Sequence, residues 1–180
     1  SDFTTSFDTT GGSQHITQSP YTVSKTPSNA PNMKGAVGFD GQRVNGVDII
    51  IPVYVFSEQH YKSTSFVTNA YRKTLANMTG KVNNASFRDF DAGEVQFRGA
   101  TGQLVIVEGT RQWQITYHFG ASPNRTHIPV GDIIVSEKLG WDYQWTLYGD
   151  AVDADTLIQR PIAAYVERPY AFVSFSQLGI

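Results

Sequence analysis

The stretch QWQITYHF, residues 112–119, decides the class of fold that this sequence predicts. Polar and apolar residues alternate in it without a break, so Ile115 and three aromatic residues share one face. This follows because successive side chains of a β-strand point to opposite sides of the sheet. The alternation therefore predicts a strand with an aromatic face towards the core and a polar face outwards.

Similar patterns occur later and earlier in the chain. Residues 141–148, WDYQWTLY, repeat the aromatic alternation and predict a second strand of the same design. Residues 94–98 and 103–107 predict two strands joined by a turn at 99–102, where two glycines stand. Shorter apolar runs predict further strands at 131–136, 161–168 and 170–176.

Nearer the N-terminus, residues 47–56 form a β-branched and aromatic run that is apolar on both faces through its middle. Such a run predicts a buried strand. Pro52 has no amide hydrogen to donate, so this strand is expected to bulge there or to lie at an edge of its sheet.

Residues 65–79 hold the one convincing helical pattern. Their apolar residues recur at three- and four-residue spacing, which places them in a single stripe that must pack on a sheet. Ser63 or Ser65 is expected to cap the start, and Gly80 stands where a left-handed residue ends a helix. The stripe consists of Phe66, Ala70, Tyr71, Leu75 and Met78.

Together these elements predict a mainly β protein, an antiparallel β-sandwich or barrel with one packed α-helix, over residues 37–180. Residues 1–36 are too rich in Ser, Thr, Gly and Pro to bury a core of their own. They predict an extended N-terminal arm held by neighbouring subunits; the alternatives are an ordinary disordered terminus and an arm folded back as an added strand near residues 21–23. The expected anchors are Phe3, Phe7, Ile16, Tyr21 and Val23.

The composition narrows the range of functions. Charged residues make up 17% of the chain, less than the roughly 25% of an ordinary soluble domain. This fits a surface that other protein covers, or a β-protein with uncharged polar outer faces. A net charge of −2 gives no electrostatic basis for binding nucleic acid. The chain has no cysteine, and no apolar stretch approaches the roughly 18–20 residues of a membrane span.

No catalytic constellation is recognisable in the sequence, so we expect neither enzymatic activity nor a cofactor or metal. No two of the four histidines lie at the spacing of a helical metal-ligand pair, and none neighbours a cysteine. The acidic segment 150–155 lacks the central Gly and terminal Glu of a calcium loop. We interpret it as a solvated loop, with a weak cation site as the alternative.

Charge is unevenly distributed along the chain. Residues 59–88 carry five basic residues and no acid, whereas residues 131–156 carry six acids and one lysine. The two regions could pair within one subunit, line a channel, or form opposite flanks that meet head to tail, as closed rings require. The charged side chains expected at inter-subunit contacts are Arg72, Lys73, Arg88, Asp150, Asp153 and Asp155.

The order of these elements, with the aromatic strand at 113–119, the Gly-Trp-aromatic segment 140–143 and the C-terminal stretch 160–180, resembles a loosely related set of phage and prophage structural proteins. The resemblance covers about residues 45–180 and extends to tail-tube subunits. It implies a virion protein, assembled in the host cytoplasm, that forms a ring of copies of itself at the head-to-tail neck or in the tail. The ring is commonly sixfold. Other partners would be neighbouring virion proteins, with DNA only as cargo in a channel and no membrane.

Two other functions stay open. A capsid decoration protein would share the sandwich and the arm. A carbohydrate-binding β-sandwich would use exposed aromatic residues as sugar platforms, with Tyr148, Tyr165 and Tyr170 as candidates. Ring formation separates assembly from sugar binding, because a sugar-binding module can work as a monomer.

Overall fold

The computed structural model describes residues 3–17, 23–30, 38–39, 41–43, 45–153 and 155–180. The described residues are mainly β-structure, with one α-helix and one short 3-10 helix, η1. No helix among them has the length and hydropathy needed to cross a membrane. In chain order the elements are β1 (Thr4–Asp8), β2 (Gly12–Ile16), β3 (Val47–Ile51), β4 (Tyr54–Ser63), α1 (Asn69–Met78), β5 (Val82–Asn83), β6 (Val95–Val107), β7 (Thr110–Ala121), β8 (Arg125–Val130), β9 (Ile133–Lys138), β10 (Tyr143–Asp153), β11 (Thr156–Glu167), β12 (Phe172–Val173) and η1 (Phe175–Leu178).

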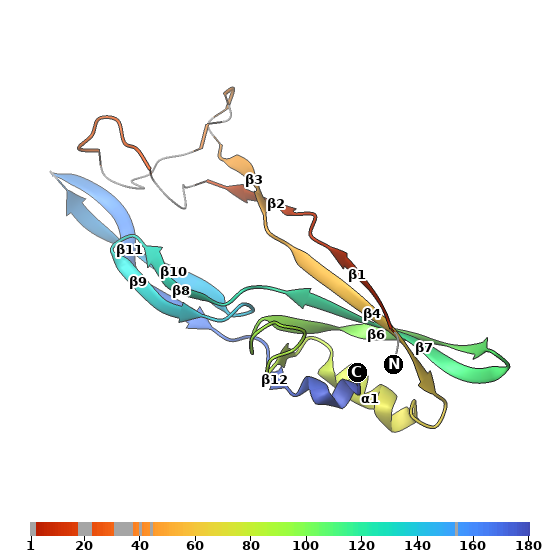
Figure 1. Cartoon of the computed structure of the whole chain (residues 1–180). Coiled ribbons are helices and arrows are strands. Elements are labelled where there is room, and N and C mark those ends of the chain that lie inside the picture. The colour runs from red at the N-terminus through yellow and green to blue at the C-terminus, as the bar shows by residue number, and fades with distance from the viewer. Residues whose placement is uncertain (1–2, 18–22, 31–37, 40, 44, 154) are drawn as a thin grey trace.

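One six-stranded sheet forms the centre of the molecule (Figure 1). Its strand order is β1-β4-β7-β6-β5-β12, and every neighbouring pair is antiparallel except β12 and β5. α1 and η1 cover one face of this sheet and enclose the core against it. The predicted mainly β, antiparallel fold with one packed helix is confirmed. The sheet of the described residues is open and sandwich-like rather than closed into a barrel.

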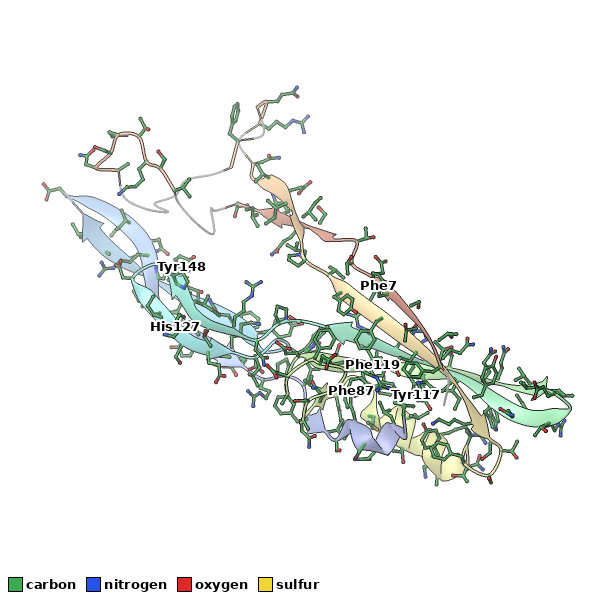
Figure 2. All side chains as sticks on the ribbon, viewed as in Figure 1. Phe7, Phe87, Tyr117, Phe119, His127 and Tyr148 are labelled. Carbon is green, nitrogen blue, oxygen red and sulfur yellow. The ribbon has the colours of Figure 1, made fainter. Side chains whose placement is uncertain are left out.

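The strand predicted from QWQITYHF is the middle of β7, and its aromatic face lies in the core (Figure 2). Ile115, Tyr117 and Phe119 are all buried. The ring of Phe119 stacks on Phe56 of β4, with centroids 4.9 Å apart, and lies 5.7 Å from the ring of Phe97 on β6. Buried aromatic pairs at such distances add about 0.5–1.5 kcal/mol each beyond the burial of their area. Three strands are thus joined through one aromatic cluster.

Helix α1 begins later than the sequence pattern predicted, because its N-terminal cap is Thr68. The Thr68 hydroxyl accepts a hydrogen bond from the amide of Tyr71 at 3.1 Å. The predicted caps, Ser63 and Ser65, were wrong, since Ser63 ends β4 and Ser65 lies in the turn between β4 and the helix. Gly80 follows the helix with a φ of 84°, which confirms the expected left-handed residue after its end.

The helix packs part of its predicted stripe on the sheet. Met78 is 1% exposed, and Tyr71 and Leu75 are partly buried against the core. The Tyr71 hydroxyl donates to the carbonyl of Leu178 and accepts from the Tyr117 hydroxyl, each at 2.7 Å. This chain of hydrogen bonds ties α1, β7 and η1 together, and burial is the main cause that raises the pKa of Tyr117. Two members of the predicted stripe are exposed, namely Phe66, which precedes the helix, and Ala70.

Strand β6 is continuous where the sequence predicted a turn. The predicted turn at 99–102 is wrong, because Gly99 makes a bulge with a φ of 118° and the ladder to β7 continues through it. The chain reverses instead at Glu108 and Gly109, with φ values of 47° and 79°. Two consecutive positive φ values are typical of a two-residue hairpin turn. Glycine fits a bulge as well as a turn, and the pairing with β7 decides between them.

The predicted buried strand at 47–56 is two strands. β3 ends at Ile51 and β4 begins at Tyr54, so Pro52 lies between them and breaks the ladder. β3 pairs with β2 outside the central sheet, and Ile50 is 81% exposed. Burial was therefore wrongly predicted for the first half of this run.

The second aromatic strand forms but is not buried. β10 begins at Tyr143 rather than Trp141 and pairs with β11 alone in a two-stranded hairpin, as β8 does with β9. Figure 1 shows these hairpins projecting from the central sheet, and the β2–β3 ribbon projecting separately from them. The remaining predicted strands correspond to β9, β11 and the short β12, after which the chain forms η1.

The N-terminal segment takes part in the chain's own sheets. β1 is the edge strand of the central sheet, where it pairs with β4, and β2 pairs with β3. This is the alternative arrangement of an arm folded back as an added strand, found at residues 4–8 and 12–16 rather than near 21–23. Residues 21–22 lie outside the described part. The predicted domain boundary at residue 36 therefore divides residues that share a sheet.

Candidate functional site

The hairpin β10–β11 carries the largest share of exposed apolar side chains. Among the described residues, nineteen large hydrophobic side chains are exposed and nine of them lie on this hairpin. A two-stranded hairpin is marginally stable by itself in water, and a contiguous apolar patch on a surface marks contact with other protein. We call this element the apolar hairpin; its exposed residues are Tyr143, Trp145, Leu147, Tyr148, Val152, Leu157, Ile162, Tyr165 and Val166.

The apolar residues occupy both faces of the apolar hairpin. Trp145 pairs in register with Tyr165, and their side chains are 61% and 50% exposed. Val152 pairs with Leu157 nearer the tip, and strand alternation places that pair on the opposite face. A strand with one solvated face would carry polar residues there. Large apolar side chains are therefore exposed on both faces of this hairpin.

A smaller apolar surface lies at the opposite end of the molecule. The β6–β7 hairpin extends past α1, and its tip points away from that of the apolar hairpin (Figure 1). Leu104 and Ile106 of β6, on the same face as Trp113, are 42% and 72% exposed there. The face of the central sheet that forms the core thus extends past α1. Its apolar side chains are exposed there.

Oppositely charged residues also gather towards the two ends. Arg72 and Lys73 are exposed on α1, and Arg72 lies over the Trp113 ring at 5.4 Å. Asp150 and Asp155 are exposed near the tip of the apolar hairpin, and Asp153 is the last residue of β10. Across the described ranges, no ion pair joins the basic region 59–88 to the acidic region 131–156. Pairing of the two regions within one subunit is therefore not seen among the side chains that the structure describes.

Arg88 differs from the other candidate basic residues. Its guanidinium donates to both carboxylate oxygens of Glu58, from Nε at 2.6 Å and from Nη2 at 2.8 Å. The charge of Arg88 is thus neutralised inside the subunit. This ion pair removes the basis for predicting that Arg88 meets an acidic neighbour.

Glu58 and His60 form a buried pair, joined by the partly exposed Arg88, that the sequence did not predict. Glu58 and His60 are 2% and 4% exposed, and the His60 Nε2 lies 2.9 Å from a Glu58 oxygen. Burial favours a raised pKa for Glu58, but hydrogen bonds from Arg88 and His60 hold it below its ordinary value. The signal that could have revealed the pair is its spacing, since residues two apart on a strand share one face.

A buried carboxylate–histidine pair is an arrangement that acid–base catalysis would need. Phe3, however, lies against the ring of His60, with centroids 4.5 Å apart and planes 12° apart. Neither of the two hollows described is lined by Glu58 or His60. One is an open groove of about 320 Å³ on the outer sheet face, lined by Arg98, His118 and side chains of β1 and β4.

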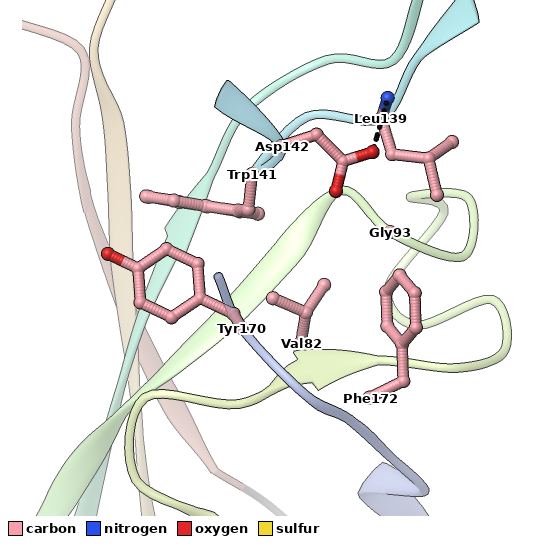
Figure 3. A pocket seen from close by; sticks show the side chains of 7 residues that line it. All are labelled: Val82, Gly93, Leu139, Trp141, Asp142, Tyr170 and Phe172. Atoms are coloured by element: carbon pink, nitrogen blue, oxygen red, sulfur yellow. Dashed lines mark hydrogen bonds between the residues drawn. The ribbon is translucent and has the colours of Figure 1, made fainter. Parts of the chain in front are cut away.

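The other is a tightly packed region where the central sheet meets the base of the projecting hairpins (Figure 3). Asp142 accepts hydrogen bonds from the Leu139 amide at 3.2 Å and from the Arg168 guanidinium at 2.9 and 3.1 Å. The Arg168 hydrogen bonds are the main cause that lowers the pKa of Asp142. The Trp141 indole donates to the carbonyl of Glu94 at 2.9 Å. These contacts hold the base of the apolar hairpin in place. They do not involve the rest of its two strands.

The anchors predicted in the N-terminal arm have different surroundings. Phe3 packs on His60 and lies 5.1 Å from the Arg88 guanidinium. Phe7 on β1 is 73% exposed (Figure 2), Val23 is 83% exposed and Ile16 is half-buried. Tyr21 lies outside the described residues. Insertion of Phe7 and Val23 into neighbouring subunits remains a prediction. Phe3, in contrast, packs against His60 of its own chain.

The tyrosines considered for sugar binding do not share a platform. Tyr165 lies on the same face as Trp145, and alternation along β10 turns Tyr148 to the other face. Tyr170 is half-buried and lies 6.3 Å from Trp141 and 6.4 Å from Tyr143, ring to ring. In the part of the chain that the structure describes, no group of His, Asp or Glu side chains could hold a metal ion.

Comparison of the chain with protein-family models, with curated proteins and with solved structures found no match.

Proposed function

We propose that this chain is a non-enzymatic structural subunit that assembles with copies of itself, and that the apolar hairpin is its principal contact. The observation that carries the proposal is the exposure of nine large hydrophobic side chains on one two-stranded element. Apolar area removed from water contributes roughly 25 cal/mol per Å². A partner that covers this hairpin would bury the apolar side chains that are exposed in the single subunit.

The two ends of the molecule suggest how copies would meet. Apolar and acidic residues lie at the end of β10–β11, and apolar and basic residues lie at the end formed by α1 and the β6–β7 tip. A contact between two different surfaces, repeated head to tail, closes into a ring when the rotation fits. Exposed ion pairs contribute about 0–1 kcal/mol each, so the charges would guide register while the apolar contact supplies affinity.

A phage particle is the setting we propose for this assembly, in a neck or tail ring. Its support is the resemblance of residues 45–180 to phage structural proteins, together with the open sheet and the exposed N-terminal strands β1 and β2 at its periphery. Neighbouring virion proteins would be further partners, and DNA would pass through the ring only as cargo. A capsid decoration protein is the competing assembly, and electron micrographs of the purified oligomer separate the two, because a decoration protein need not form a channel.

The test compares the wild-type chain with Trp145→Gln by sedimentation velocity over a range of concentrations and by negative-stain electron microscopy. We expect the wild type to form closed rings, and we expect Trp145→Gln to shift the assembly to higher concentration. Phe39→Gln is the matched control, because Phe39 has the same 61% exposure as Trp145 but lies off the apolar hairpin.

Two results would count against the proposal. A wild-type chain that stays monomeric at every concentration would contradict self-assembly. Equal weakening of assembly by Trp145→Gln and Phe39→Gln would show that general hydrophobicity drives association, and not the apolar hairpin.

A further inference from the structure

The N-terminal strand β1 adds little to the core of its own subunit. All five of its residues are exposed, and it lies at the edge of the central sheet, where β4 is its neighbour. Strand β2, three residues further on, is exposed except for its half-buried end residues Gly12 and Ile16. Replacing this pair of strands by another copy of the same residues would therefore leave the core intact.

The site that β1 occupies is nevertheless specific. The ring of Phe3 is stacked on His60 and lies 5.1 Å from the Arg88 guanidinium. The hydroxyls of Ser6 and Ser57 lie 2.7 Å apart across the β1–β4 ladder. Without Phe3, the buried Glu58–His60 pair would lose the ring that covers it. The edge of β4 thus needs an occupant with the sequence of β1.

The connection between β2 and β3 is long enough for that occupant to come from another copy. Residues 17–46 separate Ile16 from Val47, and a segment of this length can span up to about 100 Å when extended. An exchanged strand makes the same contacts as the original one, so exchange costs little beyond the geometry of the connection. Neighbours held close in an assembly raise the effective concentration of the incoming strand.

We propose that β1 and β2 are exchanged between subunits on assembly, so that Thr4–Asp8 of one copy pairs with β4 of the next. This inference rests on the proposed self-assembly and names the contact that would stitch the assembly together. The partner is a second copy of this chain, and the contact consists of Phe3 on His60 and Ser6 beside Ser57.

The absence of cysteine from the chain permits a direct test by disulfide trapping. Ser6→Cys and Ser57→Cys are made in separate chains, one of them isotopically labelled, and the reduced chains are mixed, assembled and oxidised. The hydroxyl separation and the ladder register suit a disulfide between these positions. We expect mixed covalent dimers in the assembled fraction, identified by mass, and none in the dilute monomer. The matched control is Ser6→Cys mixed with Gln103→Cys, an exposed position of the same sheet away from β1.

A double variant, Ser6→Cys with Ser57→Cys in one chain, completes the test. Oxidised as a monomer, it would lock β1 onto its own β4, and we expect its assembly to be weakened until a reductant is added. Assemblies that lack mixed dimers, or a locked variant that assembles like the wild type, would overturn strand exchange while leaving the proposed function standing. A wild-type chain that never assembles would overturn both.

Discussion

Strand β7 and strand β10 begin from nearly the same sequence pattern and end in opposite environments. Each alternates aromatic with polar residues over about one strand length. On β7, Phe119 is 1% exposed between two neighbouring strands and under η1, whereas Trp145 on β10 is 61% exposed in a hairpin. Alternation therefore determines that a strand forms and which side chains share a face. Whether that face is buried depends on the elements that pack on it.

The largest difference between the two regions is expected on truncating their aromatic side chains. Phe119→Ala should lower the free energy of unfolding by about 3–5 kcal/mol, because it leaves a cavity among stacked rings. Trp145→Ala should lower it by less than about 0.5 kcal/mol in the dilute monomer, as for other exposed positions. Denaturant unfolding below the assembly concentration measures both values. Similar losses for the two variants would mean that the hairpin is packed within its own subunit.

The ionic cluster beneath β1 should show the next largest effect. Arg88→Ala leaves the Glu58 carboxylate buried beside His60 alone. We expect a loss of about 2–3 kcal/mol at neutral pH, less than the 3–5 kcal/mol of a fully buried pair, because Arg88 is partly exposed.

The pH dependence of this loss follows from the lowered pKa of Glu58. A carboxylate with a lowered folded-state pKa contributes stability above its ordinary value of 4.5, and that contribution disappears as pH falls through the folded-state value. The difference between wild type and Arg88→Ala should therefore shrink on acidification. Chemical unfolding at neutral and acid pH tests this, with Arg111→Ala as an exposed arginine control. A difference that stays constant with pH would show that Arg88 stabilises by packing alone.

A smaller effect is expected at the helix, which lies between the two extremes of burial. Leu75 is only partly buried against the core, so Leu75→Ala should cost about 1–2 kcal/mol, below the 2–5 kcal/mol of a fully buried leucine. Lys73→Ala, on an exposed position of the same helix, should change the free energy of unfolding by less than about 0.5 kcal/mol. Thermal and denaturant unfolding give both numbers. A loss below that of the control would show that the stripe of α1 faces outwards.

The smallest effect is expected in the β2–β3 ribbon. The two ring nitrogens of His15 lie 2.9 Å from an Asp48 oxygen and 2.8 Å from the Asn45 carbonyl. The hydrogen bond with Asp48, and then the one with Asn45, raise the pKa of His15 above 6.5. A group with a raised pKa stabilises the fold below its ordinary pKa and loses that contribution as pH rises through the folded-state value. The protection factors of the β2 amides, which are exchange rates corrected for the intrinsic pH dependence, should therefore fall above the raised pKa, and His15→Gln should remove this fall. Wild-type protection factors that stay constant across this pH range would contradict a role for this ion pair.

Some elements could be predicted from local pattern because local geometry alone produces them. The alternation of residues 112–119, the helical stripe ending before Gly80 and the aromatic run after Gly140 each correspond to an element of the structure. The turn assigned to residues 99–102 failed because glycine serves a bulge and a turn equally well. The Glu58–His60 pair was missed because the strand predicted at 47–56 ended before it, so that the two residues were never placed on one face.

The sequence by itself determined the mainly β class, the single helix and the uneven distribution of charge, since these depend on residue spacing and composition along the chain. Only the tertiary structure decided that β1 folds back on β4, that Arg88 is neutralised by Glu58, and that the aromatic residues of β10 stay exposed. Each of these features depends on which segment, distant in the sequence, packs beside a given residue in the fold. The free energy gained by burying a side chain depends on both segments that come into contact. The sequence of one segment alone therefore does not determine it.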